Sequence, residues 1–153
     1  MTGISFKVTI DDAAGHAELE RLIGRMKDRR GFHRIVGEHL MKRLKVRFKN
    51  EQAPDGSRWQ AHSPVTIANR LKRFGNSPLT ILRQSGHLAS NFNYEASDAH
   101  TKVGTPVLYA AIHHFGGKAG RGHKVTIPAR PILGIEPDDP DEIMAMAEDW
   151  LTN

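Results

Sequence analysis

The sequence predicts one α+β domain spanning residues 1–153, in which an antiparallel sheet of about four strands is flanked by helices. A chain of 153 residues is long enough for one compact core but short for two ordinary domains. The expected order of elements is β-α-α-α-β-β-α-β-α, with the strands mainly in the second half. Clustered strands favour an antiparallel sheet with segregated helices over a doubly wound fold.

The first half of the chain is expected to be mainly helical. A strand is predicted at the start by apolar residues that alternate with polar ones, namely Ile4, Phe6, Val8 and Ile10. Asp11 or Asp12 can then cap a helix whose apolar stripe is Leu19, Leu22, Ile23 and Met26. After a break at 28–31, a long amphipathic helix is predicted from the spacing of Phe32, Ile35, Val36, Leu40, Leu44 and Phe48.

Turn and cap residues divide the middle of the chain. Pro54-Asp55-Gly56 predicts a turn, because proline presets the bend and glycine accepts a positive φ. Ser63 and Pro64 are a suitable N-cap and first helical residue for a short helix through Phe74, which Gly75 can end. A further helical turn is expected over 85–88.

The last third alternates short strands with helices. A β-hairpin is predicted from 92–96 and 101–105, followed by a short helix over 109–115. Glycines then indicate a flexible loop at 116–123, and a strand is expected over 123–127. Pro128 and Pro131 confine the residues that follow to a sheet edge or an extended arm. The chain should close with a helix capped by Asp139, whose buried stripe is Ile143, Met146, Ala147 and Trp150.

The net charge of +5 is unevenly distributed. Eleven Lys or Arg residues crowd 21–49 beside only two acids, whereas seven acids and no cations follow Arg130. This asymmetry is compatible with nucleic acid on the basic part, with the acidic end of one copy on the basic face of another, or with two solvated helix faces. The sequence leaves these three interpretations open.

Composition argues against several classes of protein. Without cysteine, the chain has no disulfide, thiol catalyst or thiolate metal site. No apolar run approaches the roughly 18 residues of a membrane span, and the N-terminus does not resemble a signal peptide. We therefore expect no membrane association and a location in the cytosol when the protein is made.

No catalytic, cofactor or metal site is expected. His113 and His114 are adjacent and should point in divergent directions, and no carboxylate accompanies them at ligand spacing. The glycine-rich 116–124 segment fails the P-loop pattern, because Gly122 is followed by His123 and Lys124 by Val125. Ser85 lacks the flanking glycines of a nucleophile elbow. The sequence thus predicts a protein that is not an enzyme.

Five sequence blocks occur in an order that is typical of one family. They are Pro54-Asp55-Gly56 with Trp59, Ile81-Leu82-Arg83-Gln84-Ser85-Gly86-His87-Leu88, Val103-Gly104, Tyr109-Ala110-Ala111-Ile112-His113-His114-Phe115-Gly116, and Ile127-Pro128-Ala129-Arg130-Pro131-Ile132-Leu133-Gly134. Over roughly 48–135 the chain resembles the phage virion morphogenesis, or tail completion, family of Mu-like phages and prophages. Family members often have glutamine where this chain has His114, a departure that puts any role for this position in doubt.

The resemblance implies a structural protein that completes the tail or joins it to the head at the phage neck. Its expected partners are a tail terminator, tail tube or head connector, with a homo-oligomeric ring in the virion, and its expected location is the virion after assembly in the bacterial cytoplasm. Motif residues to which we assign structural roles are Trp59, Arg83, Gly86, Tyr109, His113, Phe115, Gly116, Pro128 and Pro131. Residues predicted to form the interface are Lys118, Arg121, Lys124, Arg130 and Ile132.

The alternative is sequence-independent nucleic-acid binding through the basic helix at 25–49. Neutralising phosphates requires positive charge, which this segment has, but it lacks interleaved aromatic residues for stacking. A neck ring also lies close to the DNA passage, so a weak contact with DNA is compatible with both functions.

Overall fold

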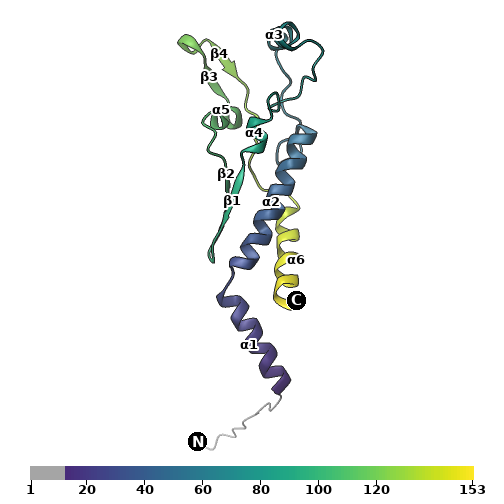
Figure 1. Ribbon diagram of the computed structural model, residues 1–153, viewed down its shortest axis with the longest axis vertical. Helices are drawn as coiled ribbons and strands as arrows, with labels where there is room; N and C mark the ends of the chain where they lie inside the picture. The colour runs from purple at the N-terminus through teal and green to yellow at the C-terminus, as the bar shows by residue number, and fades with distance from the viewer. Residues whose placement is uncertain (1–12) are drawn as a thin grey trace, which may run out of the picture.

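Figure 1 shows an elongated molecule, a computed structural model that describes residues 13–153, with long helices below and a two-armed end above. The strand expected over 4–10 lies outside the described residues. We call residues 56–92 and 105–135, which form the two-armed end, the head. No helix within 13–153 is both long and apolar enough to cross a membrane.

The long helices run in the predicted places. α1 spans Ala13–Lys27 and α2 spans Arg30–Asn50, with the predicted break between them. Val36, Leu44 and Phe48 of the α2 stripe are buried. Gly37 lies against the ring of Tyr94, so closely that a Cβ at Gly37 would be 2.2 Å from Cδ2. The absence of a side chain at this position therefore allows the hairpin to pack on α2.

α1 is amphipathic but mostly uncovered. Leu19 and Met26 of its predicted stripe are 57% and 63% exposed. Arg21 and Arg25 hold this helix to the end of α6 (Asp139–Thr152) by donating hydrogen bonds to the backbone oxygens of Thr152 and Trp150. The apolar stripe of α2 thus packs in the core, whereas the apolar stripe of α1 remains largely exposed to solvent.

The α+β class and the antiparallel pairing are confirmed, but the four strands form two separate two-stranded sheets. β1 (Asn93–Ala96) pairs with β2 (Thr101–Gly104) in the predicted hairpin and packs along α2. β3 (Gly117–Ala119) pairs with β4 (Val125–Ile127) across the short 3-10 turn η1 (Arg121–His123). The segment 116–123, predicted as a flexible loop, thus contains β3 and η1.

Glycine backbone geometry explains why this segment can fold back on itself. Gly116 has φ 74° and approaches the backbone of residue 129 so closely that a Cβ would lie 2.8 Å from its nitrogen. Gly120 and Gly122 also have positive φ, which glycine adopts at little cost. The glycines that suggested a loop instead build a tight hairpin.

The head also contains three helices. α3 (Pro64–Phe74) begins where predicted, with the Ser63 hydroxyl accepting a hydrogen bond from the Thr66 amide. α4 (His87–Ser90) and α5 (Ala110–Phe115) are the short helices expected from sequence. In Figure 1, α3 and the β3–β4 hairpin form two arms with α4 and α5 at their base.

One hydrophobic core joins the head to the upper part of α2. It is formed by residues from α2, α4, α5 and the connecting segments, namely Leu44, Phe48, Ala53, Trp59, Ile81, Leu88, Phe92, Ala110 and Ile132. The Trp59 ring meets Phe48 edge-on at 5.4 Å, and its Nε1 donates to the Pro131 carbonyl at 2.8 Å. Tryptophan thus supplies both buried area and a hydrogen bond to the extended 128–134 segment.

Asp139 is a fully buried carboxylate at the start of α6. Its Oδ1 accepts a hydrogen bond from His39 Nε2 at 2.8 Å and lies 3.2 Å from Arg43 Nε. Its Oδ2 accepts from the Glu136 amide at 2.6 Å. We predicted Asp139 as a helix cap, but the N-cap is Asp138, and Asp139 instead ties α6 to α2.

Replacing Asp139 with Asn should destabilise the fold strongly. The substitution removes the negative charge beside His39 and Arg43 and places an NH2 donor against one of the donors that the two oxygens now accept from, and breaking such a buried polar pair costs about 3 kcal/mol. Urea unfolding followed by circular dichroism measures the loss. Asp141→Asn, in an exposed position of the same helix, is the matched control and should change stability by less than about 0.5 kcal/mol. Equal stabilities for the two variants would contradict this role of Asp139.

Candidate docking surface

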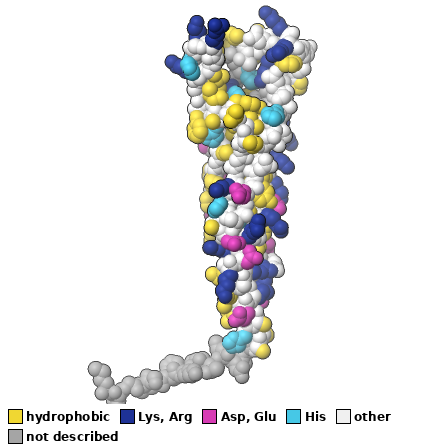
Figure 2. Space-filling model, turned by 60° about the vertical axis from the view of Figure 1, so that its left-hand side comes forward, with side chains coloured by type: hydrophobic (Ala, Val, Ile, Leu, Met, Phe, Trp, Pro, Cys, Tyr) yellow, Lys and Arg dark blue, Asp and Glu magenta, His cyan; other side chains and the backbone are white. Residues whose placement is uncertain are grey.

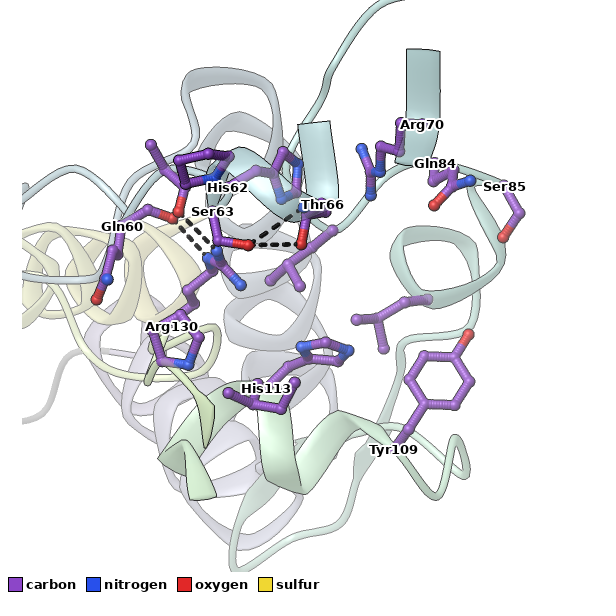
Figure 3. A pocket seen from close by; sticks show the side chains of 16 residues that line it. Gln60, His62, Ser63, Thr66, Arg70, Gln84, Ser85, Tyr109, His113 and Arg130 are labelled. Atoms are coloured by element: carbon purple, nitrogen blue, oxygen red, sulfur yellow. Dashed lines mark hydrogen bonds between the residues drawn. The ribbon is translucent and has the colours of Figure 1, made fainter. Parts of the chain in front are cut away.

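A cleft of about 670 Å³ lies between the two arms of the head. Its lining comes from the segment before α3, from α3 itself, from α4, α5 and the end of β4. Figure 3 shows Arg130, Ser63 and Thr66 along one side, with His113 and Tyr109 of the α5 segment facing them. The cleft is thus built where segments distant in sequence converge.

Arg130 holds the two sides of the cleft together. Its Nε donates to the Gln60 carbonyl at 2.8 Å, and its Nη2 donates to the Ala61 carbonyl at 3.2 Å. Its backbone amide donates to the His113 carbonyl at 2.8 Å. Burial, with a smaller effect of the nearby Arg70 charge, lowers the pKa of Arg130 from its ordinary value. This arginine therefore works as a buried clamp on backbone oxygens.

The cleft is cationic. Arg70 and Arg130 are its charged residues, and no carboxylate lines it. Burial, and secondarily the charge of Arg130, lowers the pKa of His113, whose buried Nδ1 has no hydrogen-bond partner within residues 13–153. Burial also lowers the pKa of His62. The hydrogen bond to the Thr80 carbonyl raises this pKa, and the charges of Arg70 and Arg130 lower it further.

The serine hydroxyls in the cleft have structural partners. Ser63 caps α3, and Ser85 Oγ accepts from the His87 amide at 3.4 Å. Neither serine contacts a histidine that could take its proton, in the hydrogen bonds of the described residues. The arrangement suits a surface that receives a polar or acidic group from a partner.

The two adjacent histidines serve opposite sides of α5. His113 faces the cleft, whereas His114 Nδ1 accepts hydrogen bonds from the Ile132 and Leu133 amides at 3.1 and 3.4 Å. Within residues 13–153 no group of His, Asp and Glu side chains is arranged to hold a metal ion.

Of the five residues predicted to form the interface, three are exposed and two are buried. Lys118, Arg121 and Lys124 are exposed on the β3–β4 arm. Arg130 and Ile132, by contrast, are 5% and 1% exposed, because their side chains are buried while Ala129, Pro131 and Gly134 of the same segment are exposed. In the single chain these last two residues therefore stabilise the head from within.

The residues assigned to structural motifs are distributed between core, turns and surface. Trp59 is buried, and Gly86 has φ 73° at the start of α4, a conformation that favours glycine. Arg83 is half-buried, and Pro128 lines the cleft. Pro131 offers its carbonyl to Trp59. Tyr109 and Phe115 are 44% and 77% exposed, so the rings at both ends of α5 remain on the surface.

Uncovered apolar side chains surround a second hollow of about 510 Å³ on the far side of α5 from the cleft. Its lining includes Phe92, Ala111, Phe115 and Leu133, and Leu108 nearby is 96% exposed. Figure 2 shows hydrophobic side chains gathered in the upper part of the molecule, below Lys and Arg side chains at its upper end. Large exposed apolar patches of this kind mark interaction sites.

The positive charge is concentrated in the head. Residues 56–92 and 105–135 contain nine Lys or Arg residues and no Asp or Glu. The rest of the sequence therefore has 22 − 9 = 13 Lys or Arg residues and all 17 Asp or Glu residues, a net charge of −4. The long acid-free segments are visible in the sequence, although the cations are more densely spaced at 21–49.

The basic helix at 25–49 is matched in part by the acidic C-terminal segment. Arg43 pairs with Asp138 at 2.6 Å and Glu142 at 2.8 Å, and Arg47 pairs with Glu136 at 2.7 Å. Asp138 consequently has a lowered pKa, mainly through its hydrogen bond with Arg43. The charge asymmetry of the sequence is thus partly satisfied within one chain.

An elongated subunit with a cationic two-armed head and uncovered apolar side chains is of the class that associates with other macromolecules. Residues 10–152 match the Phage virion morphogenesis family, and the chain belongs to this family.

Relatives of the chain come from Mu and Mu-like prophages. Putative capsid assembly protein G of Escherichia phage Mu is 28% identical over 142 residues, which cover 92% of this chain and 90% of that protein. Mu-like prophage FluMu G protein 2 of Haemophilus influenzae is 45% identical over 71 residues. That match covers 46% of this chain and spans about half (51%) of the length of the relative. No solved structure matches the chain significantly.

Lowering the pH should destabilise the head through its cleft histidines. His113 and His62 have folded-state pKa values below the ordinary 6.5, so the unfolded chain binds protons more readily. Their contribution to stability is complete above about pH 6.5 and declines as the pH falls below it. His113→Gln should therefore reduce the slope of unfolding free energy against pH in this range, measured by urea unfolding. The His62→Gln/His113→Gln double variant should flatten it further, and slopes equal to that of the parent would contradict the assignment.

Proposed function

We propose that the protein is a structural subunit, without catalytic activity, that acts in tail completion or head-tail joining at the phage neck. Support comes from its membership of a virion morphogenesis family and from its similarity to a protein described as a putative capsid assembly protein. The observation that carries the proposal is the head, which combines unpaired cations with exposed large apolar residues. Such a surface stabilises an assembly when a partner covers it.

The partners we propose are other virion proteins: a tail terminator, the tail tube or a head connector. The β3–β4 arm, where Lys118, Arg121 and Lys124 are exposed on a short hairpin, forms one of the contacts of this assembly. The proposed site of action is the neck or tail end of the virion.

Nucleic-acid binding through the helix at 25–49 is the alternative left by the sequence, and the structure leaves fewer cations free for it than the sequence suggests. Arg43 and Arg47 are engaged by acidic side chains, and Arg25 donates to the Trp150 carbonyl. Three of the ten Lys and Arg residues over 25–49 are thus engaged within the chain and are less available to phosphates.

Deleting the gene from an inducible phage or prophage that carries it should leave heads and tails unjoined, because a junction component would be missing. Negative-stain microscopy of the induced lysate measures the fraction of joined particles. Restoring the gene on a plasmid is the control and should return infectious particles. Joined, infectious particles from the deletion strain would contradict the proposed function.

Removing Gly117–Gly122 from the otherwise complete protein should prevent joining while the rest of the chain folds. The deletion eliminates β3 and the tip of the arm, which lie outside the hydrophobic core. Circular dichroism should show the helical content retained, and plaque counts in the complemented deletion strain should fall. Normal plaque counts would show that the arm is not the docking element.

A further inference from the structure

The exposed face of α6 has the charge opposite to that of the head. No Lys or Arg occurs after Arg130, so the whole 131–153 segment is free of positive side chains. Asp141, Glu148, Met144 and Ala145 are exposed, with Met144 at 62%. Asp141 and Glu148 form no ion pair with any residue in 13–153, unlike Asp138 and Glu142, which pair with Arg43. Spacings of three, four and seven residues place Asp141, Met144, Ala145 and Glu148 on one side of the helix.

The β3–β4 arm offers the matching surface. Lys118, Arg121 and Lys124 are exposed at its tip, and Val125 beside them is 54% exposed. No acidic residue lies between Ala99 and Ile135 to offset these cations. The arm and α6 therefore match in two ways. Their charges are opposite in sign, and each surface also has an exposed apolar residue that the other can cover.

A single chain cannot bring these two surfaces together. In Figure 1, α6 runs along the lower part of α2 towards the C-terminus, whereas the β3–β4 hairpin projects from the opposite end. Asp139 fixes α6 to α2 through its buried hydrogen bonds, so α6 does not swing up to the head. The complementarity can be satisfied only between molecules.

We propose that the β3–β4 arm of one copy docks on the outward face of α6 of a second copy. The proposal rests on the proposed function only in treating the protein as an assembly subunit. A contact between two different surfaces leaves one arm and one α6 face free in every pair, so repetition gives a closed ring or an open helical array. A second copy fits better than duplex DNA, because phosphate contacts give no role to Val125 or to the exposed Met144.

Charge reversal in the purified full-length protein tests this contact. The arm variant is Lys118→Glu/Arg121→Glu/Lys124→Glu, and the α6 variant is Asp141→Lys/Glu148→Lys. Sedimentation velocity at low ionic strength should show the parent self-associating and each variant weakened by about tenfold or more. Added salt should weaken the parent as well, because screening reduces the attraction. Circular dichroism and thermal melting establish that each variant is folded.

Mixing the two variants separates this contact from a general loss of association. The basic arm of the α6 variant fits the acidic α6 of the arm variant, and the two reversed surfaces also have opposite charges. The mixture should therefore form mixed complexes in which the two variants alternate, although neither variant associates alone. Combining both reversals in one chain exchanges the charges of the two surfaces and should restore self-association. Lys42→Glu/Lys45→Glu/Lys49→Glu, at exposed positions of α2, is the matched control and should associate like the parent.

Several results would overturn the proposal. A parent protein that stays monomeric at every concentration would do so, as would a mixture of the two variants that forms no mixed complex. So would tight, salt-sensitive binding of duplex DNA that is lost in the arm variant while the parent remains monomeric, which would assign the arm to DNA. If deletion strains still accumulate unjoined heads and tails while the purified protein never self-associates, the proposed function stands and this contact is wrong.

Discussion

The buried carboxylate of Asp139 is the contact on which the arrangement of the molecule depends. It accepts hydrogen bonds from His39 of α2 and from the backbone before α6, and it lies beside Arg43. A carboxylate with no exposure to water is costly unless its oxygens are satisfied, so only this packing of α6 on α2 stabilises it. The same requirement fixes the position at which the chain leaves the core and enters α6.

Arginine and tryptophan side chains hold the extended segment before α6 in place by donating hydrogen bonds to backbone oxygens. Arg47 and Trp59 donate to the carbonyls of Ile132 and Pro131, so the extended segment before α6 is held on two sides. Arg130, one residue earlier, reaches the other way and binds the Gln60 and Ala61 carbonyls at the base of the α3 arm. An extended segment with two prolines forms few sheet hydrogen bonds, and these side chains supply the missing partners. The two arms of the head therefore keep a defined position relative to α2.

Local signals predicted the elements, whereas pairing between distant residues was hidden from the sequence. The stripe from Phe32 to Phe48, the Ser63-Pro64 cap and the glycine in the 54–56 turn each act over a few residues, and the helices and the turn occur where these signals lie. The hairpin at 117–127 was taken in part for a loop, because glycine permits both and short strands carry little periodicity. Asp139 was recognised as an element boundary but not as a partner of His39, 100 residues earlier. The sequence does not predict the burial of Arg130 and Ile132 for the same reason, because a local pattern does not show which distant segments the chain will pack against.

The two ends of the subunit differ in charge. Arg43 and Arg47 are matched by acids within the chain, whereas the nine cations of the head have no carboxylate in their own segments. Concentrating like charges raises the electrostatic energy of the free subunit, and an acidic partner at the head lowers it. The exposed apolar residues near these cations add a contribution that salt does not screen, because burial of apolar surface depends on area and not on charge. Opposite ends of one elongated subunit thus carry different surfaces, and such polarity determines how a subunit is oriented when it enters an assembly.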